Sequence, residues 1–273
     1  MKNILVPIDF SDCSIKALQY AIGLCKITDG KLVILHSVQV PVLTEKGTET
    51  GEEIREEIDE KFNQVKKQVP LLEDVNYNFE LNFEFVLSSI RKVVKKNYID
   101  LIVMGTKGAT GAKEIFLGSN TYETIKEVKC PVIAIPEKSE SFQLGSIAFA
   151  SDYKRIKDYA DLDLMIELAK LRNSEIHILH IGEEKNMTRE ELEVGRSQDQ
   201  CFKPVRHSYH YINGTDIAKE INSYLKSNGI KLLGVYARQH SLTDKLFHQS
   251  LTQEMVFHPE VPLLVIPETS PFE

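Results

Sequence analysis

Cysteine is scarce in this 273-residue chain, and the cysteines are widely spaced. The four cysteines form no CxxC pair; they are Cys13, Cys25, Cys130 and Cys201. Disulfide scaffolds and zinc knuckles need more cysteines at closer spacing, so the sequence argues against both. Reduced thiols in a cytosolic protein fit this pattern better.

Long hydrophobic runs are also missing. No apolar stretch approaches the roughly 20 residues that a helix needs to span a bilayer. The first residues, MKNILVPIDF, reach a proline and an aspartate too early for a signal peptide. We therefore expect a cytoplasmic protein with no membrane partner.

An excess of positive charge is absent as well. The chain has 33 Lys and Arg against 40 Asp and Glu, a formal net charge of -7. A broad contact with a phosphate backbone requires the opposite balance, so nucleic acid is a poor candidate partner. The P-loop pattern, the G-x-G-x-x-G fingerprint after a strand, the HExxH motif, serine nucleophile elbows and paired catalytic carboxylates are not found either.

What the chain does contain is an alternation of apolar strands and amphipathic helices. In the first half the strands are NILVPI, KLVILHSV, VNYNFELNF, DLIVMG and PVIAIP. Between them we expect a helix capped by Ser11, a charged helix over about 45–69, a helix around 89–97 and a helix from Ser119. This order predicts an α/β fold, a doubly wound, mainly parallel five-stranded sheet with helices on both faces.

The second half repeats the first in three matched segments. SIAFASDYKRIKDYADLDLMIELAKL corresponds to NILVPIDFSDCSIKALQYAIGLCK, EIHILHIG to KLVILHSV, and VPLLVIPE to CPVIAIPE. The polar stretch EKSESFQLG separates the copies and is typical of a linker. Duplication explains the shared order and spacing, and predicts two tandem Rossmann-like domains at 1–139 and 143–273.

The stretch MGTKGATGAKEIFLGSNT concentrates glycine after a predicted strand. Its spacing is Gly105-x2-Gly108-x9-Gly118-Ser119, and it closes where a helix begins. A helix start offers unpaired amides and the positive end of the helix dipole, and glycine lets backbone approach a ligand closely. The loop therefore predicts an anion site near Ser119 and Asn120, although glycines that only make turns are the commoner case.

Taken together, ILVPIDFS, LVILHSV, the glycine loop and CPVIAIP resemble a universal stress protein, and the two halves resemble its tandem form. The resemblance covers nearly the whole chain, and G-x2-G-x9-G-[ST] is the pattern of the ATP-binding members. It implies that ATP is bound by nine residues: Pro7, Asp9, Ser37, Met104, Gly105, Gly108, Gly118, Ser119 and Asn120. Whether magnesium accompanies the nucleotide is left open.

The resemblance also implies a role for each part of this site. Asp9, with Pro7 beside it, is expected to face the adenosine, and Ser37 is expected near adenine. Met104 and Gly105 are expected to line the pocket. The ribose and phosphates are expected at the remaining positions of the loop: Gly108, Gly118, Ser119 and Asn120.

The second half departs from this pattern in its loop. Alignment places Tyr236 at the position of Gly105, Gln239 at that of Gly108 and Gln249 at that of Gly118. Ser250 matches Ser119, and Asp152 matches Asp9. Long side chains in place of glycine argue against a phosphate site there, so we expect one nucleotide per chain, in the first domain.

Two other features have ordinary explanations. Seven of the eight histidines lie in the second half, but His177 and His180, like His207 and His210, are three apart on a strand and point to opposite faces. Solvated or sheet-packed histidines are therefore expected rather than a metal site. The charged helix EKGTETGEEIREEIDEKFNQVKKQ has an apolar stripe of ordinary width, typical of a surface helix.

Three functions remain open at this point. The first is an ATP-binding stress-response regulator in which the two domains form an internal pseudo-dimer, with a homodimer and a regulatory protein as further partners. The family resemblance implies that PVIAIP and PLLVIP pair in such a contact. The second is a slow ATP hydrolase or self-phosphorylating enzyme using Ser119 or Asn120, disfavoured because no general base is evident in the loop. The third is a nucleotide-free interaction scaffold.

Overall fold

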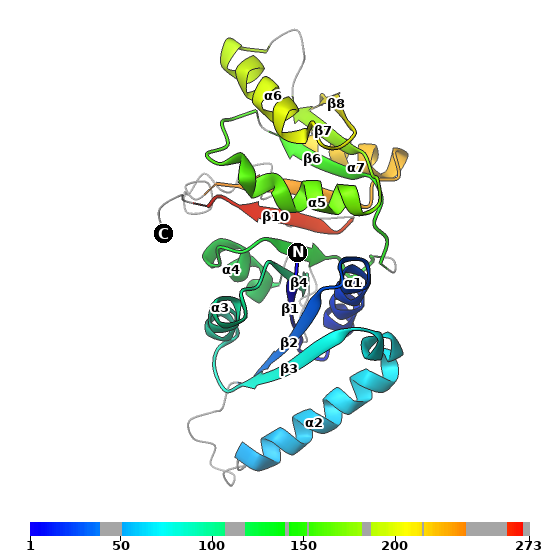
Figure 1. Ribbon diagram of the computed structural model, residues 1–273, viewed down its shortest axis with the longest axis vertical. Helices are drawn as coiled ribbons and strands as arrows, with labels where there is room; N and C mark the ends of the chain where they lie inside the picture. The colour runs from blue at the N-terminus through cyan, green and yellow to red at the C-terminus, as the bar shows by residue number, and fades with distance from the viewer. Residues whose placement is uncertain are drawn as a thin grey trace.

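The fold is a single ten-stranded sheet covered by helices in the computed structural model (Figure 1). The structure describes residues 1–38, 51–106, 118–139, 142–151, 153–181, 187–214, 216–238 and 261–269. Its first half contains β1 (Asn3–Pro7), α1 (Asp12–Thr28), β2 (Lys31–Ser37), α2 (Gly51–Gln68), η1 (Pro70–Asp74), β3 (Asn76–Asn82), α3 (Val86–Asn97), β4 (Leu101–Gly105), α4 (Ser119–Glu127) and β5 (Val132–Ile135). Its second half contains β6 (Ile147–Ser151), η2 (Tyr159–Leu162), α5 (Asp163–Leu171), β7 (Ile176–Ile181), α6 (Arg189–Phe202), β8 (His207–Ile212), α7 (Ile217–Ser227), β9 (Leu232–Ala237) and β10 (Leu263–Pro267).

The order of the strands repeats about the centre of the sheet. It runs β3-β2-β1-β4-β5 and then β10-β9-β6-β7-β8, so each half has the same internal order. The strands within each half pair in parallel, as the alternation of strands and helices predicts. The halves join through β5 and β10, the segments PVIAIP and PLLVIP, which pair antiparallel with Ile133 opposite Leu264. The boundaries 1–139 and 143–273 remain a prediction.

Buried side chains fill both faces of the sheet, which is why the strands read as continuous apolar runs. On β1, Ile4 and Val6 belong to the core packed by α1 and α2, and Leu5 to the core packed by α3 and α4. The same two layers continue in the second half under α5 and α6 on one face and α7 on the other.

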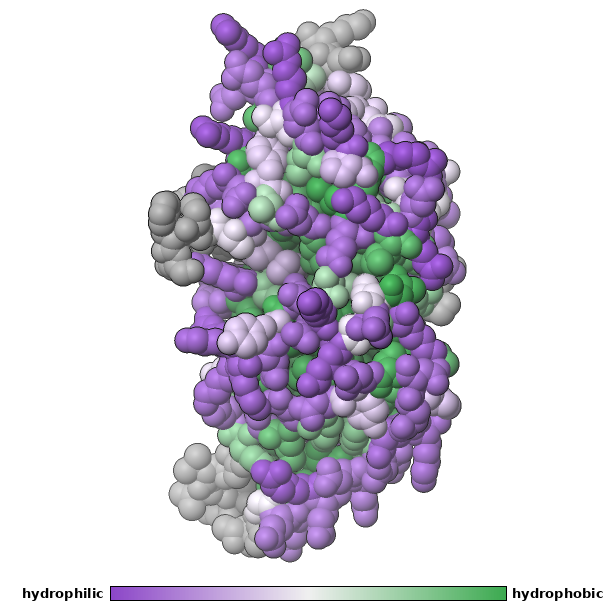
Figure 2. Space-filling view, viewed as in Figure 1, coloured by the Kyte–Doolittle hydropathy of each residue, from purple (hydrophilic) through white to green (hydrophobic). Residues whose placement is uncertain are grey.

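The charged helix α2 is a surface helix, as expected. Only three of its side chains are buried, Ile58, Phe62 and Val65, and Phe62 stacks on Phe79 of the edge strand β3 with ring centroids 4.0 Å apart. Its outer face is hydrophilic in the lower part of Figure 2. The helix is described from Gly51, so the part expected over 45–50 lies outside the described residues.

The first helix of the second half begins later than the repeat predicts. α1 starts two residues after Phe10, whereas the corresponding Tyr153 is followed by irregular chain, the short η2, and α5 only from Asp163. The strand registers identify the cause. Ile4 lies opposite Leu101 and Ile147 opposite Leu232, which sets Tyr236 at the position of Gly105. The Tyr236 hydroxyl donates to Asp161 of η2 at 2.7 Å, so Tyr236 contacts η2. Its counterpart Gly105 instead packs against the start of α1.

Candidate functional site

A cavity of about 120 Å³ opens at the carboxyl ends of β1, β2 and β4. This is where strand order reverses, because β1 lies between β2 and β4 while the chain connects β1 to β2 first. Open parallel sheets bind their ligands at such a switch point. The described walls enclose less than the about 300 to 1,000 Å³ of a typical small-molecule site, so they surround part of a nucleotide rather than all of it.

The residues predicted to form the site meet at this cavity. Eight of the nine line it: Pro7, Asp9, Ser37, Met104, Gly105, Gly118, Ser119 and Asn120. Gly108 lies outside the described residues. Segments more than 100 residues apart therefore converge as the alternation of strands and helices requires. Their roles toward a ligand remain predictions.

Asp9 is held in the wall by the start of α1. Its Oδ1 accepts hydrogen bonds from the backbone amide of Ser11, at 3.0 Å, and from the Ser11 hydroxyl. Ser11 is the N-cap, as predicted, and its side chain accepts from the Ser14 amide at 3.3 Å. The carboxylate thus lies at the positive end of a helix dipole. Asp9 both organises α1 and presents a charge at the cavity.

His36 lines the cavity and was not predicted from the sequence. Its Nδ1 lies 2.8 Å from the carbonyl oxygen of Ile8, and burial, the larger effect, lowers the pKa of its imidazole. The neutral ring donates from Nδ1 to that carbonyl, which leaves Nε2 as an acceptor. A polar residue directly after the apolar run VIL at a strand end was the available signal.

Ser37 adds a hydroxyl without a protein partner. Its Oγ is buried, and among the residues that the structure describes no hydrogen-bonding partner is found for it. Buried polar atoms are nearly always paired, so an orphan in a cavity wall points to a ligand or a water there. This is the position that the family resemblance implies beside adenine.

The start of α4 supplies backbone amides. Gly118 is the N-cap of the helix, and no side-chain capping hydrogen bond is found for it among the residues that the structure describes. Ser119 and Asn120 follow in the first turn and are exposed. The first amides of a helix have no partner within it, and they favour an anion. Gly118 has φ -53°, a conformation that any residue adopts, so its backbone does not require glycine.

Gly105 lines the cavity, but its missing side chain serves another contact. A Cβ there would lie 2.8 Å from Sγ and 2.9 Å from the backbone of Cys13 in α1. From the sequence, we expected glycine here because it lets the backbone approach a phosphate closely. That explanation is incomplete for Gly105. Gly105 lets β4 pack tightly against α1, and its carbonyl accepts from the Thr121 hydroxyl at 2.7 Å.

The histidines of the second half that the structure describes lie on the strands β7 and β8. His177 stacks on His210 at 5.1 Å and bonds the Tyr224 hydroxyl, while His180 packs on Tyr153 at 4.1 Å. His177 and His180 therefore face opposite sides, as their odd spacing predicts. Within the described ranges, no three His, Cys, Asp or Glu residues are grouped to hold a metal.

Of the loop positions at which the second half departs from the first, one lies within the described residues. Tyr236, at the position of Gly105, is buried with 6% exposure, and Arg238 lies over its ring. The other positions compared, Asp152, Gln239, Gln249 and Ser250, lie outside the described residues.

Comparison with known proteins identifies the family. The model of the universal stress protein family matches residues 1–136. A universal stress protein of Methanocaldococcus jannaschii is 32% identical over 138 residues, which cover 49% of this chain and 81% of that protein. The chain belongs to the universal stress protein family.

One solved structure extends the likeness in fold to nearly the whole length of this universal stress protein. It is that of a universal stress protein from Archaeoglobus fulgidus DSM 4304, and it covers 98% of both chains with a TM-score of 0.75 at 18% identity, which shows the shared fold. Another universal stress protein, solved in complex with cAMP, covers 49% of this chain and 96% of its own, with 15% identity and a TM-score of 0.39. In the described part of the chain, every helix is too short or too polar to cross a lipid bilayer.

Proposed function

We propose that this universal stress protein is a cytoplasmic stress-response regulator that binds ATP in its first domain. The observation that carries the proposal is the convergence of Asp9, Ser37 and the start of α4 on one cavity at the sheet's switch point. Adenosine lies between Asp9 and Ser37, and the phosphates lie against the amides of Ser119 and Asn120. The rest of the glycine loop, including Gly108, completes the phosphate side.

The chemistry of the walls supports an adenine nucleotide over a simple anion. Asp9 brings a carboxylate, which repels a bare phosphate but accepts hydrogen bonds from ribose hydroxyls. His36 Nε2 and Ser37 Oγ add an acceptor and a hydroxyl near the apolar side chain of Met104. Polar groups on one side and helix amides on the other suit a ligand with a sugar at one end and phosphates at the other.

The second domain supplies the internal partner in this proposal. Pairing of β5 with β10 makes one continuous sheet, and β5 also pairs with β4. Only β5 therefore separates the cavity end of β4 from the second domain. The bound nucleotide then biases a surface that a regulatory protein recognises.

Mass spectrometry of ligand released from freshly purified protein tests the proposal. ATP or ADP at a stoichiometry near one per chain is the expected result. Absence of any adenine nucleotide, together with no ATP binding by calorimetry, would leave the nucleotide-free scaffold. Steady formation of ADP from excess ATP would instead identify a slow hydrolase, and repeating both measurements with EDTA determines whether magnesium is needed.

A further inference from the structure

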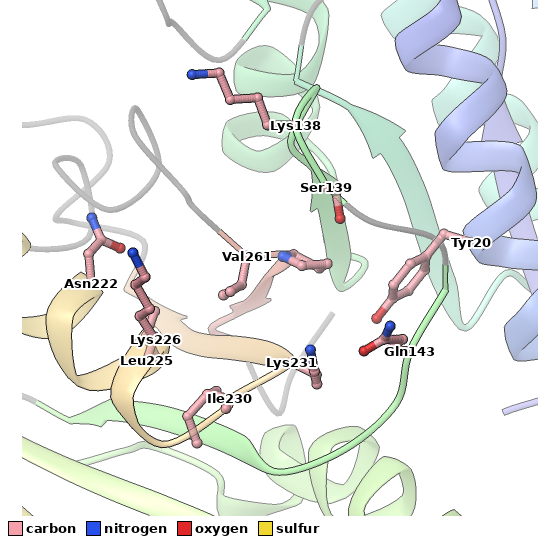
Figure 3. A pocket seen from close by; sticks show the side chains of 12 residues that line it. Tyr20, Lys138, Ser139, Gln143, Asn222, Leu225, Lys226, Ile230, Lys231 and Val261 are labelled. Atoms are coloured by element: carbon pink, nitrogen blue, oxygen red, sulfur yellow. The ribbon is translucent and has the colours of Figure 1, made fainter.

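A second, larger cavity lies between the two halves of the chain, apart from the candidate nucleotide site (Figure 3). Its volume is about 290 Å³, and it shares no lining residue with the cavity at Asp9. One wall comes from Tyr20 of α1 and from the segment that follows β5. The other comes from α7, between Asn222 and Lys226, and from the residues just before β9 and β10.

The walls of this cavity are positively charged. Three lysines line it, Lys138 from the first half and Lys226 and Lys231 from the second. No aspartate or glutamate is among the described residues that line it. Several ammonium groups around one space, without a lining carboxylate, favour an anion.

The end of α7 does not cancel this charge. The last carbonyls of a helix carry partial negative charge, but here the chain itself engages them. The carbonyl of Leu225 accepts from the amide of Ile230 at 2.9 Å, and that of Tyr224 accepts from the amide of Asn228 at 3.0 Å. Lys226 adds a full positive charge in the same turn.

Two polar atoms in the walls have no partner among the described residues. Tyr20 is 3% exposed, yet its hydroxyl makes no hydrogen bond, and the buried Oδ1 of Asn222 makes none either. Burial raises the pKa of Tyr20, so its phenol stays protonated and can donate. Figure 3 shows Tyr20 and Asn222 on opposite sides of the cavity. Each orphan costs stability in an empty protein, which a ligand would recover.

We propose that this cavity binds a compact organic phosphate that also carries hydroxyl groups, of the sugar phosphate class. The lysines neutralise the phosphate, Tyr20 donates to one of its oxygens, and Asn222 Oδ1 accepts from a ligand hydroxyl. The volume is at the lower end of the about 300 to 1,000 Å³ of small-molecule sites, which suits a single phosphorylated sugar better than a nucleoside triphosphate. Because both halves form the walls, the ligand ties them together.

Calorimetric titration of the full chain with glucose 6-phosphate tests this site, with glucose as the uncharged control. Saturable binding of the phosphate and none of glucose is expected. Lys138→Met, Lys226→Met and Tyr20→Phe should each weaken binding about tenfold or more, since hydrogen bonds to charged groups are the strong ones. Lys219→Met, the same charge change earlier on α7 and away from the cavity, should leave the affinity unchanged.

Three results would overturn the site. The first is that the wild-type chain does not bind glucose 6-phosphate. The second is that all three cavity variants bind it as tightly as the wild type. The third is that Lys219→Met weakens binding as much as Lys226→Met does. The Gly118→Val variant separates the two sites, because blocking the nucleotide site should leave this binding intact. If Gly118→Val abolishes binding and the lysine variants do not, the probe occupies the nucleotide site and the interdomain proposal is wrong. Tyr20→Phe also serves as a folding control, since removing an unpartnered buried hydroxyl should not destabilise the chain.

Discussion

The ring of Phe10 packs on the ring of His36, with centroids 4.6 Å apart, and His36 in turn lines the candidate nucleotide cavity. Phe10 has φ 63°, the left-handed conformation that bulky residues rarely adopt. The second half repeats both features, since Tyr153 has φ 51° and packs on His180 at 4.1 Å. The two halves thus share a positive φ at matching positions and an aromatic ring packed on a histidine. This supports the duplication that the sequence predicts.

The partly buried His36 makes stability depend on pH. Burial lowers the pKa of His36, and also that of His180 and His210, below the ordinary value of about 6.5. The unfolded chain therefore binds more protons than the folded one just below that pH, so the free energy of unfolding should fall as pH drops from about 7 toward 5. Urea denaturation across this range measures it. His36→Gln should flatten the slope, and an unchanged slope would show that His36 does not contribute.

Gly105 should matter for packing even without a ligand. In Gly105→Ala the new Cβ would press on Sγ and the backbone of Cys13, and backbone cannot move aside cheaply. We expect a loss of about 1 to 3 kcal/mol in the free energy of unfolding, typical of overpacking. Gly51→Ala is the matched control, because a Cβ there meets nothing within 4 Å. Equal denaturation midpoints for the two variants would contradict the packing role.

The sequence predicted the sheet and most of the site because both follow from local patterns. Apolar runs alternating with helices set the strand ends, and parallel strands bring Asp9, Ser37 and Gly105 to one edge whatever the details of packing. Ser11 marks the start of α1 by the usual capping signal, and α4 begins at Ser119 as predicted, with Gly118 as its N-cap.

What the sequence did not predict depends on neighbours far along the chain. The need for glycine at 105 arises from Cys13, and the late start of α5 accompanies a bond from Tyr236, at the position of this glycine, to Asp161 of η2. From the sequence, His36 is only the polar end of a strand. Its orientation depends on the hydrogen bond that its ring donates to the carbonyl of Ile8. Tertiary contacts of this kind leave no periodic signal in a single sequence.

Asp9 should contribute to adenosine and ATP alike. If its carboxylate accepts a hydrogen bond from a group that both ligands share, Asp9→Ala weakens both by about 1.5 to 3 kcal/mol, the range for bonds to charged groups. Ser11→Ala is the control, since it removes the capping side chain and the hydroxyl bond to Asp9 but keeps the carboxylate and the backbone amide that also bonds it. It should cost about 1 kcal/mol of stability with little loss of affinity. A loss for ATP alone would move Asp9 to the phosphate end of the site.

Gly118→Val tests the phosphate end. The backbone at Gly118 has φ -53° and ψ 144°, which valine adopts without strain, so the fold should remain intact. The added side chain stands at the lip of the cavity beside the first amides of α4, and ATP binding should be abolished. Circular dichroism and a denaturation curve check the fold, and calorimetry measures the affinity. A folded variant that binds ATP as tightly as the wild type would show that the phosphates lie elsewhere.

The chain should bind one ATP, not two. Phosphate affinity at this edge of the sheet depends on backbone that a ligand can approach, and in the second half Tyr236 replaces Gly105 with a ring tied to Asp161. That ring also bonds η2, and among the described residues of the second half no α-helix begins before Asp163, whereas α1 begins three residues after Asp9. Calorimetric titration of the intact chain should therefore give a stoichiometry near one, and Gly118→Val should reduce it to zero. A stoichiometry of two, or one equivalent of tight binding that survives in Gly118→Val, would place an ATP site in the second half despite its tyrosine.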